Sequence, residues 1–78
     1  MRIRREIARF IYDELLDGPV DGDPLADDLL DSLGMEQLIE FLEDRFGVSF
    51  ADDELTAERL GSLRAAEALV RQKLRART

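Results

Sequence analysis

The sequence of 78 residues contains no cysteine and no histidine. Without cysteine, the chain can form neither a disulfide nor a thiolate metal site, and its redox environment is left open. Without histidine, it lacks the commonest general base and the commonest metal ligand. These absences exclude Ser-His-Asp and Cys-His nucleophilic sites formed within this chain. We therefore expect a protein that is not an enzyme.

Long apolar runs are missing as well. Residues 1–16 carry early arginines, but Asp13 and Glu14 interrupt the apolar residues there. This segment has the pattern of neither a secretory signal nor a membrane span, so we expect a cytoplasmic protein that does not bind membranes. A chain this short buries only about 60–65% of its unfolded surface. We expect one domain over residues 1–78, with a thin core and no deep catalytic cavity.

Basic residues are almost absent from the middle of the chain. Residues 10–58 hold sixteen acidic residues and one basic residue, Arg45, whereas residues 1–9 and 59–78 carry net charges of +3 and +5. The whole chain has a net charge of −7. An acidic middle disfavours nucleic-acid binding, which needs cationic surface to displace phosphate counterions. It favours basic protein partners, and it also serves as a solvated surface.

Apolar residues at spacings of three and four predict two long helices, over residues 3–16 and 32–46. Gly18 followed by Pro19 is expected to end the first helix, because glycine takes the left-handed cap and proline cannot continue a helix. Gly47 is expected to end the second helix in the same way.

The remaining chain predicts two further helices. Residues 52–58 carry enough helix formers for a short third helix, and Ser62 is a natural N-cap for a last helix over residues 63–75. We expect an all-α fold, a small four-helix bundle with a long first connection and a short third helix.

The first connection, residues 17–31, is rich in turn-forming residues. An EF-hand loop that began at Asp17 or Asp21 would lack the required glycine and the final bidentate glutamate, so we expect no metal site. Three apolar residues are expected to anchor the connection to the core: Val20, Leu25 and Leu29.

Asp31 and Ser32 stand where this connection gives way to the second helical pattern. Either side chain can accept a hydrogen bond from a first-turn N–H, so the pair predicts a helix start. Ser32 would then lie exposed at the N-terminal end of the helix. A role in the cap alone is the simpler interpretation of these residues. Gly34 in the first turn lowers the stability of the helix by about 1 kcal/mol relative to alanine. Its lack of a side chain leaves space beside Ser32.

Further features of the second helix bear on function. They are the triplet Asp31-Ser32-Leu33, then Leu38 and Leu42, and then the run Glu43-Asp44-Arg45-Phe46-Gly47-Val48. Together they resemble the acyl carrier and peptidyl carrier proteins, over nearly the whole chain. The resemblance implies that Ser32 receives 4′-phosphopantetheine from coenzyme A, and that the thiol of this group holds acyl or aminoacyl groups as thioesters. It also implies that Asp31 flanks the attachment site and that Leu33 is an exposed contact for partner enzymes.

The partners implied by the resemblance have basic docking surfaces. They are a phosphopantetheinyl transferase, an acyl- or aminoacyl-loading ligase, and acyltransferase or synthase enzymes. The candidate docking residues are Leu33, Glu36, Glu40, Glu43 and Asp44. The alternative for Leu33 is ordinary core, and the alternative for the four carboxylates is a solvated helix face.

Departures from the fatty-acid carriers narrow the expectation. Glu36 and Glu40 stand where those carriers usually have apolar residues, whereas Gly34 and Gln37-Leu38 resemble D-alanyl carriers and stand-alone carriers of polyketide or nonribosomal peptide pathways. We expect a monomeric carrier of a bacterial secondary-metabolite pathway, such as antibiotic biosynthesis. The alternative is an unmodified acidic helical adaptor that binds a basic protein through its second helix.

Overall fold

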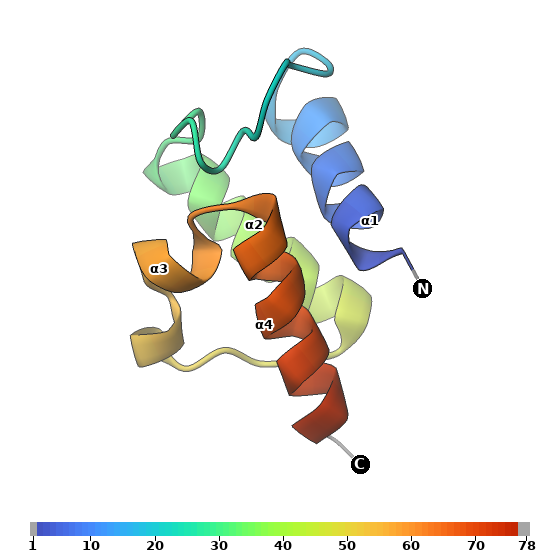
Figure 1. The fold of residues 1–78 in the computed structure, drawn as a ribbon, viewed down its shortest axis with the longest axis vertical. Helices are drawn as coiled ribbons and strands as arrows, with labels where there is room; N and C mark the ends of the chain where they lie inside the picture. The colour runs from blue at the N-terminus through green and yellow to red at the C-terminus, as the bar shows by residue number, and fades with distance from the viewer. Residues whose placement is uncertain (1, 77–78) are drawn as a thin grey trace.

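The computed structural model describes residues 2–76, and within that range the chain is helical with no strand. The all-α prediction is therefore confirmed for these residues (Figure 1). The α-helices of this range are α1 (Ile3–Phe10), α2 (Ser32–Phe46), α3 (Ala57–Leu60) and α4 (Leu63–Ala76). A π-helical segment, η1 (Ile11–Leu15), continues α1, and a 3-10 turn, η2 (Asp52–Glu54), precedes α3.

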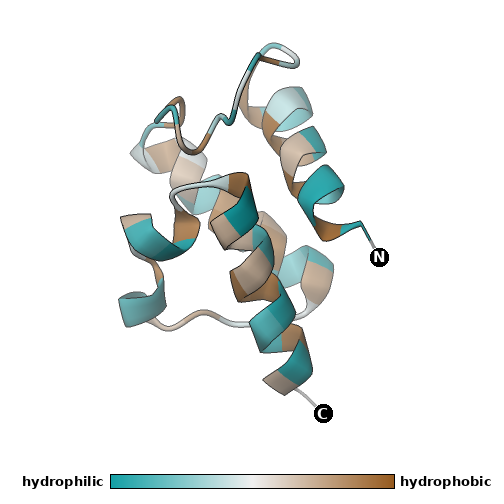
Figure 2. Ribbon diagram, in the orientation of Figure 1, coloured by the Kyte–Doolittle hydropathy of each residue, from teal (hydrophilic) through white to brown (hydrophobic). Residues whose placement is uncertain are grey.

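One apolar core lies between α1, α2 and α4. In α1 and η1, Ile3, Ile7 and Ile11 are at most 1% exposed. Their spacing of four residues keeps them on one side of a helix that turns every 3.6 residues. The ribbons of α1 and α4 accordingly alternate between apolar and polar segments in Figure 2. The other helices contribute Leu38, Leu42, Ala66, Leu69 and Val70 to this core.

The first helix ends one residue earlier than predicted, and its last turn is wider. The N–H of Leu16 donates to the carbonyl oxygen of Ile11 at 2.9 Å, five residues back, as in a π-helix. Leu16 itself is extended, with φ −121° and ψ 178°. The helix therefore stops before Gly18, which follows the helix end instead of capping it.

The connection from α1 to α2 contains a helical turn that was not predicted. Asp23 begins this turn, because its Oδ1 accepts hydrogen bonds from the N–H groups of Leu25 at 2.9 Å and Ala26 at 3.1 Å. Pro24 occupies the first position of the turn, where a missing N–H costs nothing. Asp23 and Pro24 thus act as the N-cap and first residue of a short helical turn.

The end of this turn determines which leucines are buried. The N–H of Leu29 donates to the oxygen of Pro24 at 3.0 Å, and that of Asp28 donates to the oxygen of Leu25 at 3.2 Å. Asp28 has φ +57°, so the pattern is a Schellman motif. Leu25 is buried as predicted and Val20 is half-buried, but Leu29 is 45% exposed. The prediction that Leu29 anchors the connection is wrong, because the chain turns outward after Asp28.

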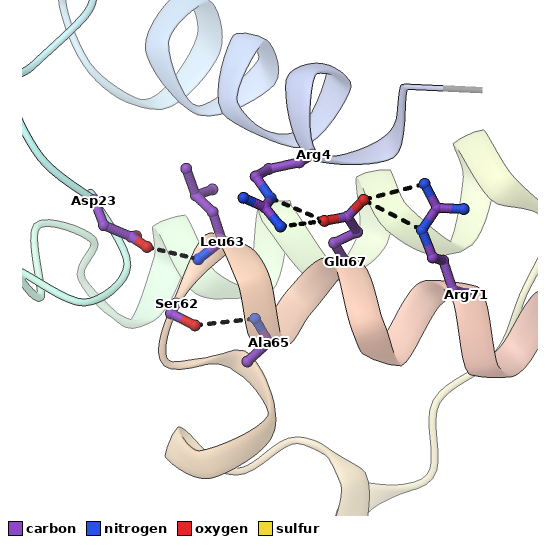
Figure 3. A network of polar contacts seen from close by, with 7 residues as sticks. All are labelled: Arg4, Asp23, Ser62, Leu63, Ala65, Glu67 and Arg71. Atoms are coloured by element: carbon purple, nitrogen blue, oxygen red, sulfur yellow. Dashed lines mark hydrogen bonds and ion pairs between the residues drawn. The ribbon is translucent and has the colours of Figure 1, made fainter.

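The same turn is joined to the start of α4. Asp23 Oδ2 accepts a hydrogen bond from the N–H of Leu63 at 2.9 Å, and Ser62 Oγ accepts one from the N–H of Ala65 at 3.0 Å (Figure 3). Ser62 therefore caps α4 as predicted. Asp23, 40 residues earlier in the sequence, accepts a hydrogen bond from a second N–H group of the first turn of α4.

The third helix differs from the prediction. Residues 52–58 were expected to form one helix, but they divide into η2 and the start of α3. Thr56 causes the division, because its Oγ1 accepts a hydrogen bond from the N–H of Arg59 at 3.2 Å and begins a new helix. Leu60, expected in a link, is the last residue of α3 and is buried.

An ion-pair network ties α1 to α4. Glu67 Oε1 lies 2.7 Å from Nη2 of Arg4, and Glu67 Oε2 lies 3.1 Å from Nη2 of Arg71 (Figure 3). The hydrogen bond from Arg4, aided by Arg71 and opposed by burial, lowers the pKa of Glu67 below its ordinary value. On the other side of α1, Glu6 pairs with Arg45 of α2 at 2.6 Å.

Removing the Asp23 carboxylate should destabilise the fold. Asp23→Ala leaves three N–H groups without their acceptor, and we expect a loss of about 2 kcal/mol in the free energy of unfolding. The matched control is Asp21→Ala, which removes an exposed carboxylate from the same connection and should change stability by less than about 0.5 kcal/mol. Urea unfolding measures both. Equal losses in the two variants would contradict the linking role of Asp23.

Glu67→Gln should destabilise the protein in a pH-dependent way. The folded-state pKa of Glu67 is lowered, so its contribution is complete above the ordinary glutamate pKa of about 4.3 and is lost as the pH falls through the lowered folded value. We expect a loss below about 1 kcal/mol at pH 7 that is smaller at about pH 3, below the ordinary glutamate pKa. Glu58→Gln, at an exposed position of α3, is the control for the charge change. A loss of equal size at both pH values would show that ionisation of Glu67 is not the cause.

Candidate functional site

The side chain of Asp31 caps α2 and leaves Ser32 unused by the cap. Asp31 is extended, with φ −83° and ψ −176°, and its Oδ1 accepts a hydrogen bond from the N–H of Gly34 at 2.7 Å. Ser32 is the first residue of α2 and is exposed. Within residues 2–76 no hydrogen-bond partner of its hydroxyl is present. The predicted helix start is confirmed, and the capping role belongs to Asp31.

Gly34 allows close approach at this helix start. The glycine is buried, and a Cβ atom there would lie 3.2 Å from Asp31 Oδ1 and 3.4 Å from Leu30 Cβ. The missing side chain thus makes room for the capping carboxylate and for Leu30. The space that it leaves faces these two residues. Packing against them therefore accounts for a glycine at position 34 without reference to Ser32.

Two large apolar side chains are exposed on either side of Ser32. They are Leu29, 45% exposed, and Leu33, 61% exposed, and no other large apolar side chain among the described residues is exposed. Leu33 is therefore not part of the core. Sequence reasoning placed Leu29 in the core, and only the Schellman motif that ends the preceding turn would have shown its outward position.

Three of the four acidic candidates continue from Ser32 along one side of α2. Glu36, Glu40 and Asp44 follow at intervals of four residues, so their side chains share a face, and all three are exposed. We call these three residues the acidic row. It begins one turn beyond Ser32 and runs toward the end of α2.

Glu43 does not belong to this row. It is half-buried, and its Oε2 accepts a hydrogen bond from the N–H of Phe50 at 3.0 Å. Glu43 therefore holds the segment that follows Gly47 against α2. The sequence places Glu43 on the outer face of α2, but its side chain is only partly exposed there because the chain folds back to it at Phe50. Its docking role stays a prediction.

An apolar cleft of about 320 Å³ lies between α2, α3 and the first connection. Its lining includes Leu30 and Met35, which are two and three residues from Ser32, and Ile39, Leu55 and Leu60 farther along. Within residues 2–76, no cluster of acidic residues has the arrangement of a metal site. No helix in this range is both long enough and apolar enough to cross a membrane.

The group available for chemistry at this site is the exposed hydroxyl of Ser32. No side chain of the described residues hydrogen-bonds to the Ser32 hydroxyl. Ser32 is exposed, as are Leu29 and Leu33, and the acidic row begins one turn farther along α2. Comparisons of the chain with protein-family models, with curated proteins and with solved structures gave no match.

Proposed function

We propose that this chain is a stand-alone carrier protein whose Ser32 is modified with 4′-phosphopantetheine from coenzyme A. The observation that carries the proposal is the exposed Ser32 hydroxyl at the first residue of α2, which the cap does not use because Asp31 supplies it. A phosphopantetheinyl transferase needs such a hydroxyl. In this proposal the chain is a substrate of enzymes and not itself an enzyme.

The residues around Ser32 fit a phosphate ester. An anionic group on the first residue of the fifteen-residue α2 lies at the positive end of the helix dipole, which favours it. The carboxylate of Asp31 is directed to the N–H of Gly34, so it is engaged inside the turn. When bound, the group supplies a flexible arm with a terminal thiol on which acyl or aminoacyl cargo can be held.

The surface beside Ser32 supports docking of basic enzymes. The acidic row provides charge that would steer a basic surface toward the hydroxyl. Leu29 and Leu33 provide the apolar contact, since they are exposed on either side of Ser32. The partners in this proposal are the transferase, a loading ligase, and acyltransferase or synthase enzymes. Tethering the cargo raises its effective concentration at each docked enzyme.

The arrangement of the helices also supports a carrier. A long connection precedes α2, and the four-residue α3 precedes α4, as expected of a carrier-type four-helix bundle. The departures at Gly34, Glu36 and Glu40 favour a bacterial polyketide or nonribosomal peptide pathway over fatty-acid synthesis. These pathway assignments rest on the sequence resemblance.

The acidic row would equally serve an adaptor that binds a basic protein without modification. This second function requires only the exposed carboxylates of α2, and it gives Ser32 no role beyond its place in the first turn. Modification of Ser32 therefore separates the two functions.

Ser32 should be the site of modification. Incubation with coenzyme A and a broad-specificity phosphopantetheinyl transferase should add one phosphopantetheine group to the wild type and none to Ser32→Ala, as measured by intact mass. Ser49→Ala, which removes another exposed hydroxyl, is the control and should be modified like the wild type. If several such transferases leave the wild type unmodified, the adaptor function is favoured.

Reversing the charge of the acidic row should slow this modification. Glu36→Lys and Glu40→Lys should each lower kcat/KM of the transferase about three- to tenfold at low salt, mainly through association. The difference should shrink near 150 mM salt, where the screening length is about 8 Å. Glu58→Lys makes the same charge change on α3 and should have a smaller effect. Unchanged rates for both α2 variants at low salt would show that these carboxylates are only a solvated face.

A further inference from the structure

A second surface, distant in sequence from Ser32, has the opposite charge. An open groove of about 890 Å³ runs along α1 and is bounded by the start of α4. Ala8, Tyr12 and Leu63 give its floor an apolar character. The groove lies on the α4 side of α1, whereas Phe10 stacks on Phe41 of α2 at 4.1 Å between ring centroids.

Four exposed arginines line the groove: Arg2, Arg4, Arg5 and Arg9. Two of them are paired within the groove, because Arg4 contacts Glu67 at 2.7 Å and Arg9 contacts Asp13 at 3.5 Å. Arg2 and Arg5 have no carboxylate partner among residues 2–76. The groove therefore keeps a net positive charge, although the chain as a whole carries −7.

The stability of α1 does not explain Arg2 and Arg5. They lie at the N-terminal end of the helix, where cations oppose the helix dipole. Arg2 stands at the N-cap position, and its side chain makes no capping hydrogen bond. Arg2 and Arg5 thus cost stability and gain no ion pair within the described residues. Binding of an external anion would offset that cost.

Two kinds of anionic partner fit poorly. A membrane would need a free apolar face on α1, but Ile3, Ile7 and Ile11 are buried in the core. A nucleic acid carries charge along its whole length, so its segments beyond the groove would be repelled by the acidic row. A segment of an acidic protein can reach the groove alone and avoid both obstacles.

We infer that the groove along α1 binds an acidic segment of a partner protein that carries at least one large apolar side chain. The guanidinium groups of Arg2 and Arg5 bind carboxylates, for which their planar donor geometry is suited. The apolar side chain lies on the floor formed by Ala8, Tyr12 and Leu63, and its burial supplies the anchor. This binding does not depend on modification of Ser32.

The test uses a short fluorescein-labelled peptide of glutamates with one central phenylalanine and one leucine. Its anisotropy is measured against the full chain at low and moderate salt. We expect saturable binding that weakens as salt rises, with amide chemical-shift changes at Ala8, Tyr12 and Leu63. Two matched peptides, one with glutamine for glutamate and one with serine for both apolar residues, should bind at least about fivefold more weakly, since each lacks half of the recognition.

Arg5→Glu and Arg64→Glu form a matched pair of protein variants. Both replace exposed arginines with the same change of charge, but Arg64 lies on α4 and does not line the groove. Arg5→Glu should weaken peptide binding by at least about fivefold and Arg64→Glu by less than about twofold. A melt of each variant checks that the fold is retained, as expected for exposed positions.

Several results would overturn the inference. They are absence of peptide binding, equal weakening by the two variants, shift changes confined to other surfaces, and tighter binding to vesicles with anionic phospholipid than to the peptide. Self-association of the chain that Glu40→Lys abolishes would identify the acidic row of a second copy as the occupant. That result would also contradict a separate acidic partner.

Discussion

The carboxylate of Asp23 is the contact on which the placement of the candidate site depends. Its two oxygens accept three N–H groups, two within the first connection and one at the start of α4. The first two bonds start a helical turn whose end directs Leu29 outward, and the third fixes that turn against α4. Ser32 follows three residues after Leu29. The position of the exposed hydroxyl is thus determined by a carboxylate nine residues earlier and by a helix start that lies far beyond it in the sequence.

The sequence predicted best those features whose causes are local. The bounds of α2 were correct because Asp31 and Gly47 act on their own first and last turns, through a cap at 2.7 Å and a left-handed residue with φ +67°. The predicted bounds of the first helix were nearly correct, but a π turn cannot be recognised from the spacing of apolar residues. The division of the third helix followed from Thr56, whose capping preference competed with the helix formers around it.

The site could be predicted less completely, because tertiary contacts decide it. Asp23 and Pro24 carried a readable signal for a helix start, yet among so many turn formers they were assigned to an irregular connection. Nothing local links Asp23 to Leu63, 40 residues away. The sequence does not distinguish Glu43 from the other carboxylates of α2. Only the hydrogen bond from the N–H of Phe50, in the segment after α2, sets it apart. Leu33 was expected to be exposed only through the resemblance, and Leu29 was missed.

The separation of charge has a consequence for how this small protein meets other molecules. Arginines gather along α1 on the side of α4, and the three carboxylates of the acidic row lie along α2. Such a distribution gives the molecule a permanent electric dipole. In the field of a charged partner this dipole exerts a torque, so the protein turns while it is still diffusing and arrives with one surface in front. The sign of a partner's charge would then determine which surface of the protein it meets, before the two molecules come into contact.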